Sequence, residues 1–381
     1  MAVEYTRGMP GELPEIRDFI NMVFSMHSRP HDFGTLLPKL YRENAGSEPQ
    51  HYLAREDGRI VAAVCAHPFT ICCQGITLPC TAIGSVSVHP YARGQGFMRS
   101  LMDTAVNDME QSGIALSVLD GRRHRYAYYG YEPAGHRLEY QITDDNLRHM
   151  DASCHRTVLS ALPLSPSLED FSAHIHEFCA LQSQRTIYTR RTPAEFAYIA
   201  SSWGSTLYRL AADGKTVGYA CAVDGTVREL VLHNESFLYD SLVALLEAMQ
   251  GTTLTISVAP WDTARITYIT PLYDHFCIHS DDKYHIFDFP RVLAFFLAAK
   301  AANVSMPNGR FTFAVDQASP TCVSLENREV CITPASETSV RLTRAQATAA
   351  FFSPDALFSS PMPTAPTWFP LPLSIPTPHT C

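Results

Sequence analysis

The sequence has 381 residues, of which 46% are hydrophobic and 18% are charged, and its formal net charge is −9. A chain of this length exceeds one ordinary hydrophobic core, and its composition is that of a packed globular protein rather than a disordered or fibrous one. The acidic balance and the lack of a run of basic residues argue against a nucleic-acid surface, which needs clustered Lys and Arg.

Cysteine and histidine usage and the N-terminus bear on location and metal binding. The eleven cysteines are an odd number and follow an N-terminus without a secretory pattern, so we expect a reduced, cytoplasmic protein. No window approaches the ~18 uninterrupted apolar residues of a membrane span. The sixteen histidines show no HExxH motif and no paired Cys/His spacing, so we expect no metal.

The N-terminal third alternates helix and strand patterns. Apolar residues recur at helical spacing in the first stretch, and the Asp57-Gly58 pair favours a hairpin turn between two strands. The expected elements, in chain order, are a helix over 12–26, strands over 51–55, 59–64 and 82–88, a helix over 96–111 and a strand over 115–119. This order predicts an α/β layout with a mixed sheet.

Two further blocks follow. The second repeats strands, a helix at about 235–249 and a strand at 253–258, but lacks a glycine-rich loop between strand and helix. The third begins with a helix at Phe289-Pro290 and ends in a proline-rich tail whose Trp368 favours burial. We therefore predict an α/β (α+β) protein with three domains, at residues 1–150, 151–285 and 286–381.

The segment from Val86 to Met102 passes from a strand through a turn into a helix. A helix start presents unsatisfied N–H groups and about half a positive charge, which suits a pyrophosphate. Gly94 and Gly96 allow a close approach of the backbone, and Arg93 and Arg99 add charge. Two glycines alone fit an ordinary strand-to-helix turn equally well.

The loop Arg93-Gly94-Gln95-Gly96-Phe97-Met98 resembles the coenzyme A loop of the GNAT superfamily of N-acetyltransferases. It departs from the usual family pattern at Met98, where Gly or Ala is common. The run Arg93-x-x-Gly96-x-x-Arg99-x-Leu101-Met102 is similar to the Eis type (enhanced intracellular survival), and so is the segment from Tyr126 to Ala134, which matches the pattern Y-x-x-F/Y-G-Y-x-P-A.

This resemblance implies tandem GNAT folds with mixed sheets, the first active and the second degenerate, followed by a sterol-carrier-protein-like domain. It implies acetyl-CoA as the cosubstrate and a closed homo-oligomer such as a hexamer. The residues expected at the cofactor are Val86, Val88, Arg93, Gly94, Gly96, Phe97, Met98, Arg99 and Gly121.

Acyl transfer from a thioester to an amine requires a polarised carbonyl, a protonated leaving thiolate and a neutral amine. Backbone N–H groups of Val86 and Val88 suit the first task if the strand edge is splayed. The resemblance assigns the acid to Tyr126, whereas Tyr128, Tyr129 and Tyr131 are expected to pack or to position coenzyme A.

The resemblance also assigns the base to the C-terminal carboxylate of Cys381, which is ionised at neutral pH. A frayed terminus is the alternative. His89 and Glu132 are fallback bases, and the proline that follows His89 favours a structural role for it.

Phe24, His27 and Asp32 are expected to flank the acceptor cleft, although a solvated helix end explains them as well. We therefore expect an N-acetyltransferase that modifies a primary amine of a small cationic acceptor, similar to an aminoglycoside, a polyamine or lysine. The alternatives are a coenzyme A- and lipid-binding protein without turnover, and transfer of an acyl chain longer than acetyl.

Overall fold

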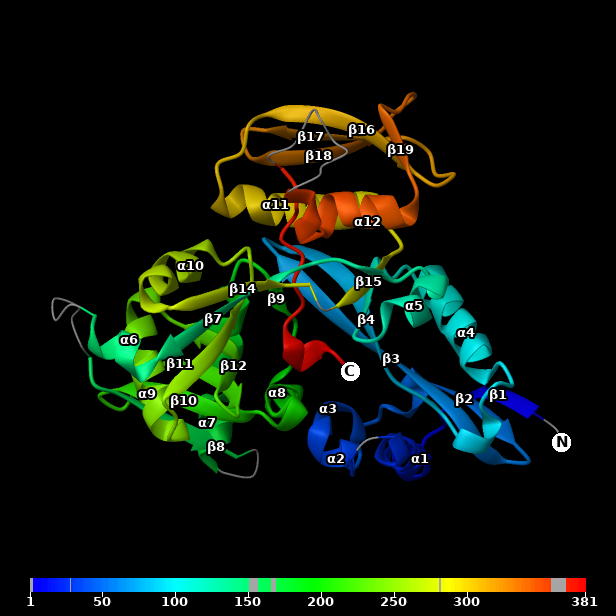
Figure 1. Ribbon diagram of the computed structural model, residues 1–381, viewed down its shortest axis with the longest axis horizontal. Coiled ribbons are helices and arrows are strands. Elements are labelled where there is room, and N and C mark those ends of the chain that lie inside the picture. The colour runs from blue at the N-terminus through cyan, green and yellow to red at the C-terminus, as the bar shows by residue number, and fades with distance from the viewer. Residues whose placement is uncertain (1–2, 28, 151–156, 166–168, 281, 358–367) are drawn as a thin grey trace.

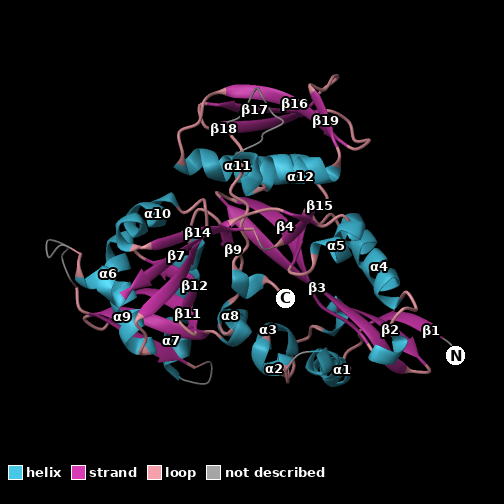
Figure 2. Cartoon of the chain, in the orientation of Figure 1, coloured by secondary structure: helices cyan, strands magenta, loops and turns pink. Residues whose placement is uncertain are grey.

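The computed structural model describes residues 3–27, 29–150, 157–165, 169–280, 282–357 and 368–381. The described strands form three separate sheets, and each sheet has its own helices (Figure 1 and Figure 2). The mixed α/β class expected from the sequence is confirmed. None of the described helices is both long enough and apolar enough to cross a membrane.

The first sheet contains strands in the order β1-β2-β3-β4-β5-β15-β6, and β9 pairs with β3 at one side. Helix α4 covers one face, and the helices α1 to α3 cover the other. The strands are β1 (Val3–Arg7), β2 (His51–Glu56), β3 (Arg59–Cys73), β4 (Ile76–Val88), β5 (Leu116–Leu119), β6 (Glu132–Pro133), β9 (Tyr188–Thr189) and β15 (Lys283–Ile286). The helices are α1 (Leu13–His27), α2 (Phe33–Leu36), α3 (Pro38–Tyr41), α4 (Phe97–Gln111) and α5 (Arg123–Tyr126).

Strand β4 determines the shape of this domain. It pairs in parallel with β5 only up to the pair Ala82–Val118, so its last residues have left β5. On the β3 side, Cys65 pairs with Gly84 and Ala63 pairs with Ser87, which leaves β4 with one extra residue. A β-bulge of this kind bends the strand and redirects its backbone groups.

The second sheet has the order β14-β7-β13-β12-β11-β10-β8. Its strands are β7 (Arg137–Thr143), β8 (Leu159–Leu164), β10 (Thr206–Ala212), β11 (Lys215–Val223), β12 (Thr226–Leu232), β13 (Thr253–Val258) and β14 (His275–His279). Its helices are α6 (Asp144–Arg148), α7 (Glu169–Ser183), α8 (Pro193–Ala200), α9 (Leu238–Met249) and α10 (Thr263–Ile269).

This sheet repeats the central unit of the first one. Strand β12, helix α9 and strand β13 follow one another as β4, α4 and β5 do, and β12 and β13 share only a short parallel pairing. The start of the second unit differs, because the Asn234 side chain accepts a hydrogen bond from the Ser236 N–H at 2.9 Å and Glu235 pairs with Arg265. Asn234 and the ion-paired Glu235 therefore occupy the helix start that Gly94 and Gly96 leave open in the first unit.

The sheets do not follow the domain boundaries expected from the sequence. Strand β7 and helix α6, placed before residue 150 in the first domain, belong to the second unit, and β15 pairs with β5 and β6 of the first sheet. The expected division at 150 itself lies beside residues 151–156, which are outside the described part of the chain. Alternation of apolar residues indicates a strand but not the sheet that receives it.

The third sheet, in the order β18-β17-β16-β19, packs on two helices. Its elements are α11 (Phe289–Asn303), β16 (Gly309–Val315), β17 (Thr321–Glu326), β18 (Glu329–Pro334), β19 (Val340–Leu342) and α12 (Arg344–Phe352). The C-terminal segment leaves this domain and passes down between the first two, where the chain ends (Figure 1).

Two lysines, the buried Lys39 and the half-buried Lys300, hold the C-terminal segment by its carbonyl groups. The Lys300 ammonium donates to the carbonyls of Trp368 and Pro370 at 2.8 and 3.0 Å. The Lys39 ammonium donates to the carbonyls of Pro378 and Thr380 at 2.6 and 2.7 Å. Extended backbone without a neighbouring strand needs such donors when it is buried.

A buried ion pair joins the second domain to this segment. Arg191 donates to both carboxylate oxygens of Glu229, at 2.8 and 2.6 Å, and its Nε donates to His379 at 2.9 Å. The side chains of Arg191 and Glu229 are 0% and 2% exposed. Removal of one partner therefore leaves a charge without compensation in the interior.

We expect Glu229→Gln to lower the free energy of unfolding by about 3 kcal/mol, because the guanidinium of Arg191 stays buried without its counter-charge. Urea denaturation of the full chain measures this change. Arg148→Gln is the matched control, since Arg148 pairs with Asp144 through side chains that are 67% and 42% exposed; it should change stability by less than about 0.5 kcal/mol. Equal effects of the two substitutions would contradict the assignment.

Candidate active site

The start of helix α4 is open to an anion. Gly94 and Gly96 have φ angles of +82° and +86°, which L side chains rarely adopt, and Gly96 is the N-cap without a side-chain hydrogen bond to the helix. The first turn of α4 contains no acidic residue. The amide groups at this end are thus left for a ligand, and the helix dipole favours a negative one.

A groove of about 440 Å³ begins at this helix start. It is lined by the turn, by the end of β4 and by the last turns of α1. The residues expected at the cofactor that line it are Val86, Val88, Arg93, Gly94, Gly96, Phe97 and Met98, and Phe24 and His27 from the expected acceptor set lie there too.

The bulge of β4 lies where this groove meets a larger cavity. Ser85 takes a left-handed conformation with φ of 52°, and Val86 lines both hollows. The Tyr41 hydroxyl donates to Ser85 Oγ at 2.7 Å and lies 3.0 Å from Nε2 of buried His51. This support holds a strained backbone in place, as is common at functional sites.

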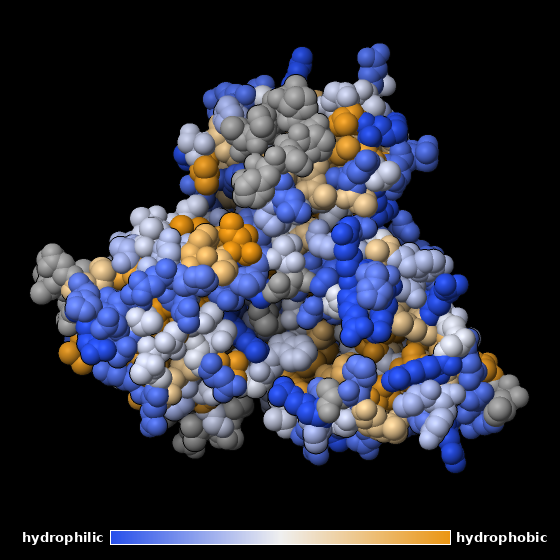
Figure 3. Space-filling view, in the orientation of Figure 1, coloured by the Kyte–Doolittle hydropathy of each residue, from blue (hydrophilic) through white to orange (hydrophobic). Residues whose placement is uncertain are grey.

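The larger cavity, of about 670 Å³, lies between the first and second domains. The molecular surface is hollowed between these two parts in Figure 3. Tyr126 and Cys381 both line it, together with Ser85 and Val86 of the bulge. The structure therefore brings the expected acid and the C-terminus into one cavity that joins the groove.

Tyr126 is 6% exposed and ends helix α5. Burial raises the pKa of its phenol, and the neighbouring Arg125 guanidinium opposes this shift in part. A raised pKa keeps the hydroxyl protonated at neutral pH, as a proton donor requires. Gly121, expected at the cofactor, instead lies against this ring, because a Cβ there would stand 2.4 Å from Tyr126 Cε2.

Cys381 lies against the backbone of β4. A Cβ on Gly84 would stand 2.3 Å from Cβ and 2.7 Å from the carboxylate carbon of Cys381, so this position admits only hydrogen. Burial raises the pKa of the Cys381 thiol and the nearby Lys39 opposes the shift. A thiol in that state is a poor nucleophile.

Four expected residues make other contacts in the structure. Asp32 caps helix α2, accepting from Gly34 N–H at 3.0 Å and from the Thr35 hydroxyl at 2.7 Å. Arg99 stacks over the Tyr128 ring at 4.8 Å. His89 accepts from the Tyr91 N–H, and Glu132 pairs with Arg123 at 3.1 Å. None of these four residues lines the groove or the larger cavity.

The wall contributed by the second domain was not anticipated from the sequence. Its residues stand about 40 positions or more from the loop in the chain, and no local motif marks them. They are Arg137, Glu139, Trp203, Thr226, Arg228 and Ser257. For Asp32 a local signal did exist, since an Asp two residues before a Gly and three before a Thr fits a helix cap.

Comparison with known proteins gives one domain match and several solved structures of similar fold. Residues 4–134 match the family model described as an acetyltransferase (GNAT) domain. No curated protein sequence matches the chain. Among solved structures, a GCN5-related N-acetyltransferase from Anabaena variabilis is similar at a TM-score of 0.67 and 15% identity, with 98% of each chain covered.

Two other solved structures are similar in fold to this chain over most of its length. Eis1 from Mycobacterium abscessus is similar at a TM-score of 0.61 and 14% identity, covering 100% of this chain and 99% of that one. A GCN5-related N-acetyltransferase from Kribbella flavida is similar at a TM-score of 0.63 and 17% identity, covering 91% of this chain and 88% of that one. At these identities the likeness concerns the fold, whereas the sequence match identifies residues 4–134 as an acetyltransferase domain of the GNAT family.

Proposed function

We propose that the protein transfers an acetyl group from acetyl-CoA to a primary amine of a small acceptor. The observation that carries this proposal is the meeting of two hollows at the β4 bulge. One begins at the open start of α4, and the other contains Tyr126 and the C-terminus. Phe24, Val86 and Arg125 line both, so a thioester held in one would face an amine in the other.

The residues at the α4 start fit a pyrophosphate. The uncapped amide groups after Gly96 supply donors, and Arg93 beside them supplies charge. Bound there, acetyl-CoA supplies an acetyl group activated as a thioester. The bulge supplies backbone N–H groups near Val86 that suit the carbonyl oxygen of this group.

Two groups of this chain suit the proton transfers. The bond from carbon to sulfur breaks while the bond from carbon to nitrogen forms, so the nitrogen loses a proton and the sulfur gains one. The Cys381 carboxylate is a base that suits the first task, directly or through water. The buried, protonated phenol of Tyr126 suits the second.

A lipid-binding protein without turnover would need an apolar cavity in the third domain, and the apolar residues of α11 are the candidates for its lining. Leu293, Phe295, Phe296 and Leu297 are each at most 1% exposed. Phe296 packs edge-on against Phe295 and Phe352, at ring distances of 5.1 and 6.1 Å. Core packing explains these side chains, so they give no support to a lipid cavity.

The resemblance to the Eis type further supports three finer proposals. The third domain would be sterol-carrier-protein-like and would serve to deliver the C-terminus to the cavity. The acceptor would be a small cationic amine. The chain would form a closed homo-oligomer, and light scattering in solution tests this expectation.

We expect Tyr126→Phe to lower kcat by about 100-fold to 10,000-fold, since the leaving thiolate loses its proton donor. Release of free coenzyme A thiol, measured across a panel of primary amines, reports the rate. Tyr128→Phe is the control, because Tyr128 is 64% exposed and outside both hollows. An unchanged kcat in Tyr126→Phe with the best acceptor would exclude the acid role.

Variants at the C-terminus distinguish the role of the Cys381 carboxylate from the role of its thiol. Cys381→Ala retains the carboxylate and should keep wild-type turnover. Deletion of Cys381 withdraws the carboxylate by one residue, about 3.5 Å, and should lower kcat at least 10-fold. Gly84→Ala should act in the same direction, because its methyl group would displace Cys381.

Coenzyme A affinity, measured by calorimetry, should stay unchanged in the C-terminal variants, because the open helix start is untouched. Full turnover in the deletion variant would show that the base lies elsewhere.

A further inference from the structure

The cavity between the domains carries charges of both signs. Its acidic groups are Asp120, Glu139, Asp282 and the terminal carboxylate, and its basic groups are Arg29, Arg125, Arg137 and Arg228. An acceptor with cationic groups alone, such as a polyamine, would place positive charge beside guanidinium groups in the same cavity, which repel it. The lining instead suits an acceptor that carries a negative group as well as its amine.

Arg228 is one of the arginines that line this cavity, and it stands at a bulge of β12. In β12, Val227 pairs with Ala222 and Glu229 pairs with Cys221, so Arg228 is the extra residue of a β-bulge. Strand β12 has the place in the second unit that β4 has in the first. The bulge at Arg228 therefore corresponds to the bulge at Ser85 and Val86, and residues of both bulges line the cavity. Bulges of this kind redirect a side chain, often next to a site.

The partners of Arg228 differ from those of the neighbouring arginines. Arg191, Arg185 and Arg265 each form an ion pair with a carboxylate. Arg228 donates from Nη1 to the Trp203 carbonyl at 3.1 Å, and within the described ranges of the chain it forms no ion pair. Desolvation lowers the pKa of Arg228, since the side chain is half-buried. A partly desolvated guanidinium with one neutral acceptor has donors left for an anion.

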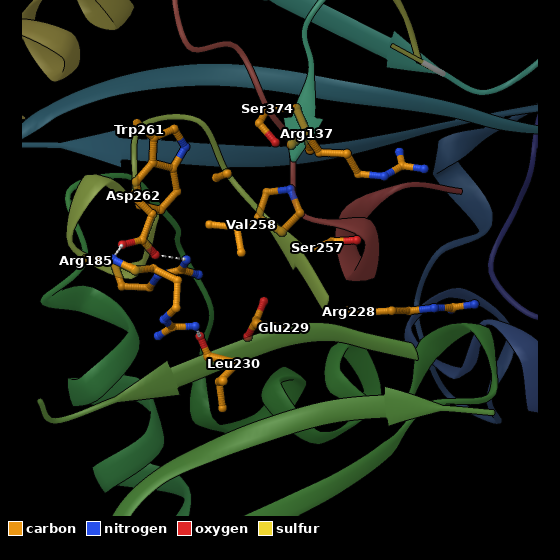
Figure 4. A pocket seen from close by; sticks show the side chains of 14 residues that line it. Arg137, Arg185, Arg228, Glu229, Leu230, Ser257, Val258, Trp261, Asp262 and Ser374 are labelled. Atoms are coloured by element: carbon orange, nitrogen blue, oxygen red, sulfur yellow. Dashed lines mark hydrogen bonds and ion pairs between the residues drawn. The ribbon is translucent and has the colours of Figure 1, made fainter. Parts of the chain in front are cut away.

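Arg137 lines the same cavity from β7. Figure 4 draws an adjacent pocket that both residues also line, and in it the guanidinium groups of Arg137 and Arg228 extend to the same side, away from the pair Arg185 and Asp262. The two arginines therefore present positive charge to one region of the cavity from two strands of the second sheet.

Trp203 connects Arg228 to the C-terminus. Its carbonyl accepts from Arg228, and its indole Nε1 donates to the Thr380 carbonyl at 3.3 Å. Trp203 adopts a left-handed conformation with φ of 63°, which is uncommon for a large side chain. One strained residue thus fixes the distance between the guanidinium and the residue that precedes Cys381.

We propose that the acceptor carries a carboxylate in addition to its reactive amine, and that Arg228 binds this carboxylate. The acceptor class is then an amino acid or a short peptide, not a polyamine or an amino sugar. The planar fork of a guanidinium matches a carboxylate with two parallel hydrogen bonds, which fixes the direction of the molecule in the cavity. This inference rests on the proposed acetyl transfer.

Matched pairs of acceptors test the proposal. Lysine and ornithine are compared with cadaverine and putrescine, which lack only the carboxylate, by release of coenzyme A thiol from the full chain. We expect kcat/KM to be about 10-fold to 100-fold higher for the diamino acids, as a charge-assisted hydrogen bond would give. Arg228→Gln should remove this preference, mainly by raising KM for the diamino acids.

Two further variants control for folding and charge. Arg228→Lys keeps the charge without the fork and should retain part of the preference. Arg59→Gln replaces an exposed arginine at the start of β3, outside the cavity, and should behave as wild type. Calorimetric titration of lysine into each variant with coenzyme A bound gives a readout that does not need turnover.

The outcomes separate the two proposals. Equal or faster acetylation of the diamines by wild type, or a carboxylate preference that survives in Arg228→Gln, overturns the inference and leaves acetyl transfer standing. A preference for O-phosphoethanolamine over ethanolamine and over the diamino acids would show that the acceptor's negative group is a phosphate. This result would also overturn the carboxylate inference. Failure to acetylate any amine while coenzyme A binds overturns the proposed function itself.

Discussion

The separation of β4 from β5 after Ala82 is the constraint on which the site depends. Two parallel strands that part leave backbone groups without a neighbouring strand, and such groups are costly when buried. The chain fills this opening from one side with the C-terminal segment, and the groove at the α4 start enters from the other. The bulge at Ser85 and Val86 lies where the two meet.

The C-terminal segment fits this opening because several unrelated parts of the chain are shaped for it. Gly84 leaves room for Cys381, and Lys39 satisfies two carbonyls of the segment. His379 is held by Arg191, whose ion pair with Glu229 lies in the second domain. The segment leaves the third domain and touches the other two, so the arrangement of all three domains decides where the chain ends.

The two tandem units show how one topology serves two purposes. In the first unit the helix start is open and the strand bulge presents backbone groups to a cavity. In the second unit Asn234 and Glu235 occupy the helix start, whereas the bulge is retained and presents Arg228 to the same cavity. The second unit is closed to a pyrophosphate at its helix but still contributes to the wall of the site.

The sequence by itself determined the features that depend on neighbours in the chain. The α4 start could be predicted, because Gly94, Gly96 and the helix that follows form a continuous pattern. The match of residues 4–134 to the GNAT domain confirms the resemblance to the GNAT family that this pattern indicated. Only the tertiary structure decided which sheet receives β7 and β15, and that Arg228 and Trp203 line the cavity. Strand pairing and cavity walls join residues far apart in the chain, and local spacing carries no record of which distant strands will meet.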